Sequence, residues 1–328
     1  MSFFNQCNSN IRVLSNYSIY VIAMCYFSKH CDESGSVIFF ISDNISLTIT
    51  NTMFHSCYSI SGDGGVFYFQ GNNCLTRISH CCARNCYCDS QNFGNFLYSY
   101  GNNVCLIGLN LTSIYNCSPF DGCGYGTILI QYHFLIFDSI NSSNNKALNS
   151  PSFNIQYACD CVFSKWTIIN CSSTDEGCLI IDIFDKAFSI VQMNFINNYC
   201  MGYGLIHVSD NCHIIDSSIF KNIGLLFFEI NNVFLHQCYL NHPFSISTSD
   251  QPTVISISPL ENTFLITLGE IYCSEKPSNN NNLILQLLPY GIALIIGIIV
   301  LSILLIYKRI KKERDDMMFS DLLESHIG

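Results

Sequence analysis

The best candidate for a catalytic site is a group of four acidic residues that lie close together in the sequence. Asp175 and Glu176 share a polar segment, and Asp182 and Asp185 lie in or just after the apolar run that follows. Carboxylates that converge on one face can act as general acid and base or bind Ca²⁺, as in polysaccharide lyases and hydrolases. Lys165 is the closest preceding cation that could stabilise an enolate. The pattern does not recur in neighbouring segments, so an ordinary solvated loop is the alternative interpretation.

The chain contains 20 cysteines, far more than a reduced cytosolic protein usually carries unless it binds metal. Cys86 and Cys88, and Cys159 and Cys161, are Cys-x-Cys pairs, whereas zinc needs paired Cys-x2–4-Cys motifs or histidines at matching spacing. Cys82 and Cys86 are four apart, but no second pair and no histidine pair completes a zinc site. Four cysteines recur at one corner of the repeat described below: Cys57, Cys86, Cys117 and Cys171. We expect them to stack as buried thiols or to form disulfides between neighbouring repeats. A metal site and a catalytic thiol are the lesser alternatives, and we expect no cofactor.

Asn-x-Ser/Thr sequences also favour passage through an oxidising secretory route. The six candidate glycosylation sites are Asn16, Asn44, Asn110, Asn116, Asn141 and Asn170. All of them precede the membrane span that is predicted below.

Tyrosines at strand positions could form a stripe that binds sugar rings or a partner protein. These tyrosines are Tyr68, Tyr98, Tyr100, Tyr132 and Tyr203. Inward packing is the alternative, because alternation alone does not show which side of a strand faces the core. The single histidines His133, His207 and His213 are interpreted as surface or stacked residues rather than as ligands.

These residues belong to a short pattern that recurs about every 20 to 30 residues. An apolar run, such as residues 66–69, is followed by a polar turn, such as residues 71–73, and then by a second strand-like run. The runs are rich in Ile, Val, Phe and Tyr, which predicts strands, and no helical periodicity persists. A repeat of this length predicts a solenoid. We therefore expect an all-β fold, a right-handed parallel β-helix.

Glycines and asparagines mark the corners of each predicted coil. Glycines that could supply a positive φ open successive coils: Gly35, Gly65, Gly94, Gly126, Gly177, Gly204 and Gly224. The polar turns align as one column: Asn44, Asn73, Asn103, His133, Asp160, Lys186, Asn211 and Asn232. A second corner carries Asn or Cys, as at Asn85-Cys86 and Asn170-Cys171. We expect stacked asparagine side chains to hydrogen-bond along the axis as a ladder.

Residues 283–307 contain 25 consecutive residues without a charge, which predicts a C-terminal transmembrane helix. Five cations at 308–314 follow at once, so the tail, 308–328, is expected in the cytoplasm and residues 1–282 outside the plasma membrane. The ectodomain divides into β-helix coils over 1–245, membrane-proximal capping strands over 246–276 and a tether over 277–282. The N-terminus has no clean signal peptide, so the route of export stays open.

The chain is similar to known families of surface proteins. GGVF at 64–67 and FINN at 195–198 resemble the GGA[IVL] and FxxN signatures of polymorphic outer membrane proteins. The whole chain also resembles the β-helix surface proteins of parasitic protists, which carry many such coils, one C-terminal span and a short tail. The resemblance implies a surface-exposed protein of the adhesion or antigen class.

The expected function is adhesion or recognition without catalysis, with the membrane and host-cell glycans or surface proteins as partners. Nucleic acid is excluded, because the formal net charge is −10 and phosphates select basic faces. The alternative is a membrane-tethered polysaccharide lyase or hydrolase that uses the acidic group. A coat or decoy antigen without a specific ligand is the third possibility.

Overall fold

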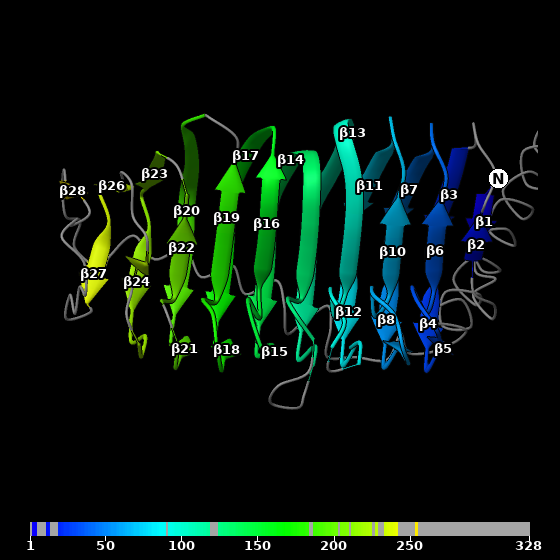
Figure 1. The fold of residues 1–328 in the computed structure, drawn as a ribbon, viewed down its shortest axis with the longest axis horizontal. Helices are drawn as coiled ribbons and strands as arrows, with labels where there is room; N and C mark the ends of the chain where they lie inside the picture. Colours follow the sequence, from blue (N-terminus) through cyan, green and yellow to red (C-terminus); the bar gives the residue numbers. More distant parts are fainter. Residues whose placement is uncertain are drawn as a thin grey trace, which may run out of the picture. The chain divides into compact units, whose positions relative to one another are not determined.

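The computed structural model describes residues 2–4, 11–13, 19–89, 91–118, 124–183, 186–202, 204–209, 211–224, 227–228, 233–241 and 253–254. All of them belong to the first of the two units into which the chain divides, residues 1–275 and 276–328. The described residues form strands, turns and bends, and none of them lies in a helix. The fold is an all-β parallel β-helix of about seven turns, and its coils follow one another along the long axis of Figure 1. The prediction of a parallel β-helix is confirmed.

Each coil contributes strands to three faces, and the strands within each face are parallel. The first face contains β2 (Ile11–Val13), β6 (Ile38–Ile41), β10 (Phe67–Gln70), the starts of β13 (Leu97–Tyr115) and β14 (Ile128–Ser143), β16 (Phe153–Ala158), β19 (Leu179–Ile183), β22 (Ile206–Val208) and β25 (Phe227–Phe228). The second face contains β1 (Ser2–Phe4), β3 (Ile19–Ala23), β7 (Ser46–Thr50), β11 (Leu75–Ser79), the middles of β13 and β14, β17 (Asp160–Ile169), β20 (Phe188–Ile196), β23 (Cys212–Ile215), β26 (Val233–His236) and β28 (Thr253–Val254).

The third face contains β4 (Tyr26–Ser28), β8 (Met53–His55), β12 (Cys82–Arg84), the ends of β13, β14, β17 and β20, β24 (Ser218–Phe220) and β27 (Tyr239–Asn241). Two short ladders follow it. They are β5 (Cys31–Asp32) with β9 (Tyr58–Ser59), and β15 (Lys146–Ala147) with β18 (Ser172–Ser173) and β21 (Tyr199–Cys200). All these pairings are parallel, so equivalent positions of successive coils lie side by side.

Inward side chains stack in register along the axis, because alternate residues of each strand face the core. One fully buried row of the first face consists of Ile38, Phe67, Leu97, Ile128, Phe153, Leu179 and Ile206. Trp166, the single tryptophan of the chain, is buried with ring centroids 4.7 Å from Phe153 and 4.6 Å from Phe163. Fully burying one large apolar side chain contributes about 1.5–3 kcal/mol, so these rows hold the coils together.

The corner after the third face is built from residues in the left-handed backbone region. Within the described residues, this row consists of Lys29, Ser56, Asn85, Asn116, Asn144, Asn170, Asn197 and Lys221. The Nδ2 of Asn116 donates to the Oδ1 of Asn85 at 2.7 Å, and the Nδ2 of Asn197 donates to the Oδ1 of Asn170 at 2.6 Å. Asparagine suits this corner because it tolerates a positive φ and its amide reaches the next coil.

The next position faces the core and is cysteine in some coils and asparagine in others. The buried row consists of Cys57, Cys86, Cys117, Asn145, Cys171, Asn198 and Asn222. The Oδ1 of Asn198 accepts from the N–H of Cys171 at 2.9 Å, and its Nδ2 donates to the carbonyl of Ile168 at 3.0 Å. Asn145 and Asn222 bond neighbouring backbone groups in the same way. In the coils that carry cysteine, the thiol donates to the carbonyl at the equivalent position, as from Cys86 to Phe54 and from Cys171 to Ser142.

The four cysteines of this row are free thiols. Hydrogen bonding to the Cys86 thiol and burial raise the pKa of Cys57, and burial together with hydrogen bonding to Cys117 raises the pKa of Cys86. Three of the thiols therefore lie on successive coils, while Asn145 separates Cys117 from Cys171. Cys25 and Cys82, which lie outside this row, are disulfide-bonded.

The turn after the first face is less regular than the sequence predicts. The Nδ2 of Asn73 donates to the Oδ1 of Asn44 at 2.6 Å. One coil later the register of β13 shifts between Tyr100 and Cys105, so Cys105 rather than Asn103 lies opposite His133. Extra residues in a local irregularity are absorbed without moving the strands on either side. The predicted column is therefore not continuous.

Glycines at the coil openings meet two different needs. The positive-φ glycines include Gly35, Gly64, Gly94, Gly126 and Gly224. At Gly65 the reason is space instead, because a Cβ would lie 2.0 Å from the backbone oxygen of Asn95. A Cβ at Gly177 would likewise lie 2.3 Å from the backbone oxygen of Gly204. The prediction of a positive φ is therefore wrong for Gly65 and Gly177. Glycine is needed at these positions because adjacent coils approach closely.

Several predictions fall on residues outside the described part of the chain. They are Asn16, Asp185, Tyr203, Asn232, the side chain of Asn103, nearly all of the capping segment 246–276, the tether 277–282, the span 283–307 and the tail 308–328. Within the described residues, no helix is long and apolar enough to cross a membrane.

Asn211, a member of the predicted turn column, lies within the described residues and is exposed. Its carbonyl accepts from the N–H of Phe188 at 3.0 Å.

Candidate functional site

The acidic group predicted from the sequence is divided by the fold. Glu176 and Asp182 line one groove of about 590 Å³ over β16, β19 and β22 of the first face. Asp175 is exposed at the corner that precedes β19 and does not line the groove. Asp185 lies outside the described residues. The structure therefore brings two of the four carboxylates to a common surface.

Strands β19 and β22 place the polar side chains of the groove. Ile181 pairs with Val208, and both are buried, so the residues that follow them point outward. The hydroxyl of Ser209 donates to the Oδ1 of Asp182 at 2.7 Å. His207 lies opposite Ile180 on the outer side of the same pair of strands and also lines the groove.

The rest of the groove wall comes from β16 and from two glycines. Gln156 and Tyr157 lie at one end, and Gly177 and Gly204, where adjacent coils approach closely, also line the groove. Among the lining residues that the structure describes, none is a lysine or arginine. The carboxylate, imidazole and amide groups of the groove can exchange hydrogen bonds with hydroxyl groups of a ligand. In the part of the chain that the structure describes, no group of three or more metal-ligating side chains is close enough to hold an ion.

Three tyrosines on successive coils lead along the axis to this groove, and we call them the tyrosine run. The ring of Tyr100 meets the ring of Tyr132 edge to face at 5.6 Å, and Tyr132 stacks on Tyr157 at 5.1 Å. Tyr100 is 41% exposed and Tyr157 is 38% exposed. Beside them, the Nε2 of Gln131 donates to the Oε1 of Gln156 at 2.6 Å. The run thus combines flat apolar surfaces with amide groups, and its last member lines the groove.

A second aromatic row lies on the same face. Phe39, Tyr68 and Tyr98 stack in order, with ring centroids 5.0 and 5.3 Å apart. Phe93 lies 6.2 Å from Tyr98 and is 39% exposed. Burial raises the pKa of Tyr98 to about 12, so its hydroxyl stays protonated at neutral pH. The four described tyrosines of the predicted stripe therefore form two rows on the first face rather than one.

Residues that complete the site were not identified from the sequence. Tyr157, Gln156 and Ser209 are the additions. A signal was present for two of them, because a Gln-Tyr pair occurs at residues 131–132 and again at residues 156–157. The position of Ser209 depends on the pairing of β19 with β22, which no local pattern gives.

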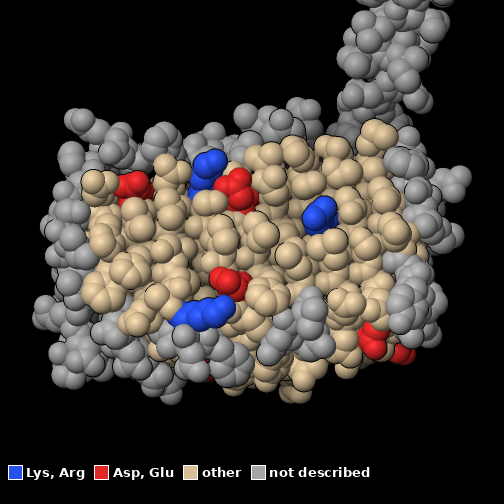
Figure 2. All heavy atoms as spheres, turned by 90° about the horizontal axis from the view of Figure 1, so that it is seen from above, with Lys and Arg blue, Asp and Glu red and all other residues tan. Residues whose placement is uncertain are grey.

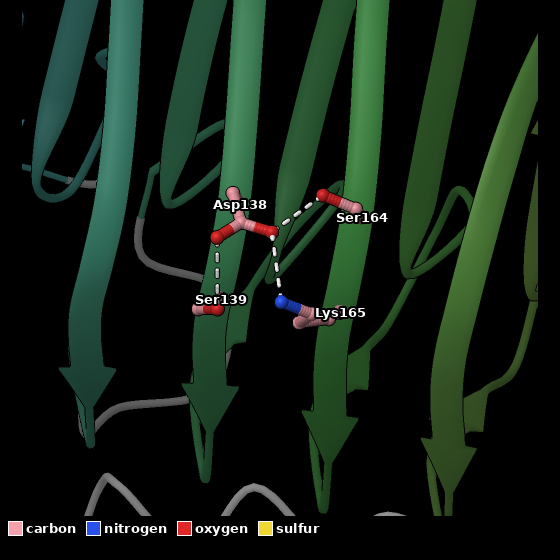
Figure 3. Close-up of polar contacts among 4 residues, drawn as sticks. All are labelled: Asp138, Ser139, Ser164 and Lys165. Carbon is pink, nitrogen blue, oxygen red and sulfur yellow. Dashed lines mark hydrogen bonds and ion pairs between the residues drawn. The ribbon is translucent and has the colours of Figure 1, made fainter.

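The second face carries the cation that the catalytic hypothesis used. The Nζ of Lys165 lies 3.9 Å from the Oδ1 of Asp138, and the hydroxyls of Ser139 and Ser164 donate to the same carboxylate at 3.0 and 2.5 Å (Figure 3). These side chains are partly exposed, and such an ion pair contributes little to stability. Lys165 therefore neutralises Asp138 rather than facing the groove.

Charge is sparse over the surface of the coils. Figure 2 shows a face on which a few acidic and basic side chains, some of them next to one another, stand in a largely uncharged surface. Only 12% of the residues are charged, so tyrosine, asparagine, serine and glutamine provide most of the polar surface. Such a surface suits a ligand with many hydroxyl groups better than one that is recognised by charge.

The candidate glycosylation sites differ in exposure. Asn110 and Asn170 are exposed, whereas Asn44 and Asn116 are half-buried in or beside the asparagine ladders. Asn141 is 6% exposed, and its Nδ2 donates to the hydroxyl of Ser113 at 3.1 Å. A glycan at Asn141 is therefore incompatible with this fold.

No known protein family, characterised protein or solved structure matches this chain. The groove and the tyrosine run are the basis of the functional proposal that follows.

Proposed function

We propose that this chain is a single-pass cell-surface protein whose β-helix recognises an extended glycan along its first face. Residues 283–307 anchor it in the plasma membrane, with the coils outside and the tail 308–328 in the cytoplasm. The uncharged 25-residue segment and the five cations after it support this orientation. Adhesion to glycans of a host cell is the role that such a protein would serve.

The observation that carries the proposal is the tyrosine run that ends in the groove. Sugar rings have apolar faces and hydroxyl edges, and tyrosine offers a flat apolar ring with a polar tip. Tyr132 and Tyr157 present such rings on successive coils, and Asp182, Ser209 and His207 follow in the groove. Coils repeat at about 4.8 Å, so equivalent groups recur along the axis and fit a polymer better than a compact ligand.

The charges favour a neutral glycan. Glu176 and Asp182 line the groove, and no lysine or arginine is among its described lining residues. An acidic polysaccharide would meet like charges there, whereas the hydroxyl groups of a neutral chain would donate to the carboxylates.

The test is binding of the purified full chain to an array of neutral and acidic oligosaccharides of increasing length. The proposal predicts binding to neutral chains that strengthens with the number of sugar units. Binding to none of them, or equal binding to single sugars and long chains, would contradict it.

A second candidate function is hydrolysis of the neutral glycan or, where the substrate is instead a uronic-acid polymer, lyase cleavage; one observation favours it. Glu176, Asp182 and His207 line the same groove, and general acid–base catalysis needs titratable groups on one surface. Release of reducing ends or unsaturated uronides by the full chain, abolished by Asp182→Asn, would support it. No release from any glycan that binds would reject it.

A further inference from the structure

Two histidines lie close together on the outer side of the second face. Strands β23 and β26 pair in parallel, with His213 opposite Phe234 and Ile215 opposite His236. The alternate residues Cys212, Ile214, Val233 and Leu235 are buried. Both imidazoles are therefore held on the outward side of two adjacent strands, and both are partly accessible to solvent.

The two rings face each other through nitrogen atoms. The Nδ1 of His213 is 3.0 Å from the Nε2 of His236, and the ring planes differ by 31°. The ring of His213 stacks on Phe234 at 4.8 Å with an angle of 14°, which restricts its rotation. In the absence of an ion, one of the two nitrogens carries the proton and donates to the other.

The same separation suits two ligands of one metal ion. Imidazole nitrogens bind such ions at about 2.0–2.1 Å, so two that occupy adjacent positions at right angles, as in square-planar or octahedral coordination of Cu²⁺ or Ni²⁺, lie about 2.8–3.0 Å apart. Each lone pair must turn by about 45° from the line between the two nitrogens to point at a common ion in this geometry. Paired strands and the Phe234 stack hold the two nitrogens at this separation before any ion binds, which lowers the entropic cost of binding.

We propose that His213 and His236 form a binding site for a divalent transition-metal ion of the nickel, zinc and copper class. The two imidazoles supply two coordination positions, and water supplies the others, because the described residues contain no larger group of ligands. The site is independent of the glycan-binding groove, which lies on the first face. Binding ties together the two coils that contain β23 and β26.

The experiment is calorimetric titration of the purified full chain with Ni²⁺, which does not oxidise thiols. His213→Gln and His236→Gln are each expected to weaken the histidine-dependent binding by at least about tenfold, since even partners outside the ligand set are worth that much. The matched control is His80→Asn, because His80 is an exposed corner residue with a φ of 52° that asparagine adopts readily. Unchanged Ni²⁺ binding in both glutamine variants would overturn the proposal.

A second measurement covers the case in which a variant does not fold, which the fluorescence of the buried Trp166 reports. X-ray absorption spectroscopy of the unmodified chain with one equivalent of Ni²⁺ is expected to show two imidazole ligands among oxygen donors. Fewer than two imidazole ligands would overturn the assignment.

Discussion

Tyr132 and Tyr157 occupy equivalent places on successive coils and stack with ring centroids 5.1 Å apart and planes 20° apart. Both have a positive φ, 61° and 54°, at the turn that ends the first face. A tyrosine in this backbone region is uncommon and strained relative to asparagine or glycine. The strained backbone presents two rings on the outer surface, where Tyr157 is 38% exposed and lines the groove. This relationship links the coiled scaffold to its proposed ligand.

The first prediction concerns the close approach of coils at Gly65. Gly65→Ala would place a Cβ 2.0 Å from the backbone oxygen of Asn95 and 2.5 Å from that of Tyr87, and neither backbone can move without moving its coil. We expect a loss of several kcal/mol or failure to fold. Gly108→Ala is the matched control, since its Cβ would meet nothing closer than 3.9 Å. Urea unfolding followed by Trp166 fluorescence compares the two, and equal midpoints would contradict the account.

The second prediction concerns the buried asparagine row. Asn198→Ala removes the acceptor for the Cys171 N–H and the donor to the Ile168 carbonyl. Two buried backbone groups left unpaired predict a loss of roughly 2–4 kcal/mol in the free energy of unfolding. Asn197→Gly removes the exposed neighbouring ladder side chain but keeps the positive φ of 54° permitted, so we expect a much smaller loss. A loss for Asn197→Gly as large as for Asn198→Ala would show that the two ladders contribute equally.

The third prediction concerns acid. His133 is buried, its Nδ1 donates to the carbonyl of Gln131 at 2.6 Å and its Nε2 lies 3.1 Å from the hydroxyl of Ser99. Burial lowers the pKa of His133 from 6.5 to about 4, so below pH 6.5 the unfolded chain binds a proton that the folded chain refuses. The free energy of unfolding should therefore fall as the pH drops from 7.5 to 5, by about 2 kcal/mol from this residue.

The check is the difference in this pH effect between the natural chain and His133→Gln. Urea titrations at both pH values should show a smaller loss in the variant, because glutamine does not titrate. An identical loss would mean that His133 is not held neutral by the fold.

The fourth prediction concerns glycosylation after export through a secretory pathway. Folded protein should carry glycans at the exposed Asn110 and Asn170 and none at Asn141, whose amide is buried against Ser113. Mass spectrometry of glycopeptides from folded protein measures occupancy at each site. An occupied Asn141 would require a different arrangement of β14.

The recurring pattern of apolar runs and polar turns was the basis for predicting the fold and its corner contacts. Short apolar runs separated by Gly and Asn indicated parallel coils, because strands that stack in register must carry similar residues at equivalent positions. The Asn85–Asn116 and Asn170–Asn197 contacts follow from the same corner pattern. These features depend on short stretches of the chain, so they can be predicted from a single sequence.

Features that depend on exact register could not be predicted. The irregularity in β13 moves Cys105 opposite His133, and spacing alone gave Asn103. Asp182 and Glu176 share a groove on the first face, whereas Lys165 lies on another face beside Asp138. The face that each residue occupies depends on where its coil turns. His213 and His236 are diagonal neighbours across the paired strands β23 and β26, because His213 lies directly opposite Phe234. This contact depends on the strand register, which the sequence does not give.

The most direct test of the central claim is the affinity of the full chain for a neutral oligosaccharide that binds on the array, measured before and after changing the tyrosine run. Tyr132→Asn and Tyr157→Asn keep a residue that tolerates the positive φ and remove one ring each. Each should weaken binding by roughly three- to tenfold, the worth of one aromatic contact. Tyr58→Asn, which disrupts the stacked Tyr58–Tyr87 pair away from the first face, should leave the affinity unchanged. Unchanged affinity in both tyrosine-run variants, or an equal loss in Tyr58→Asn, would contradict recognition along this face.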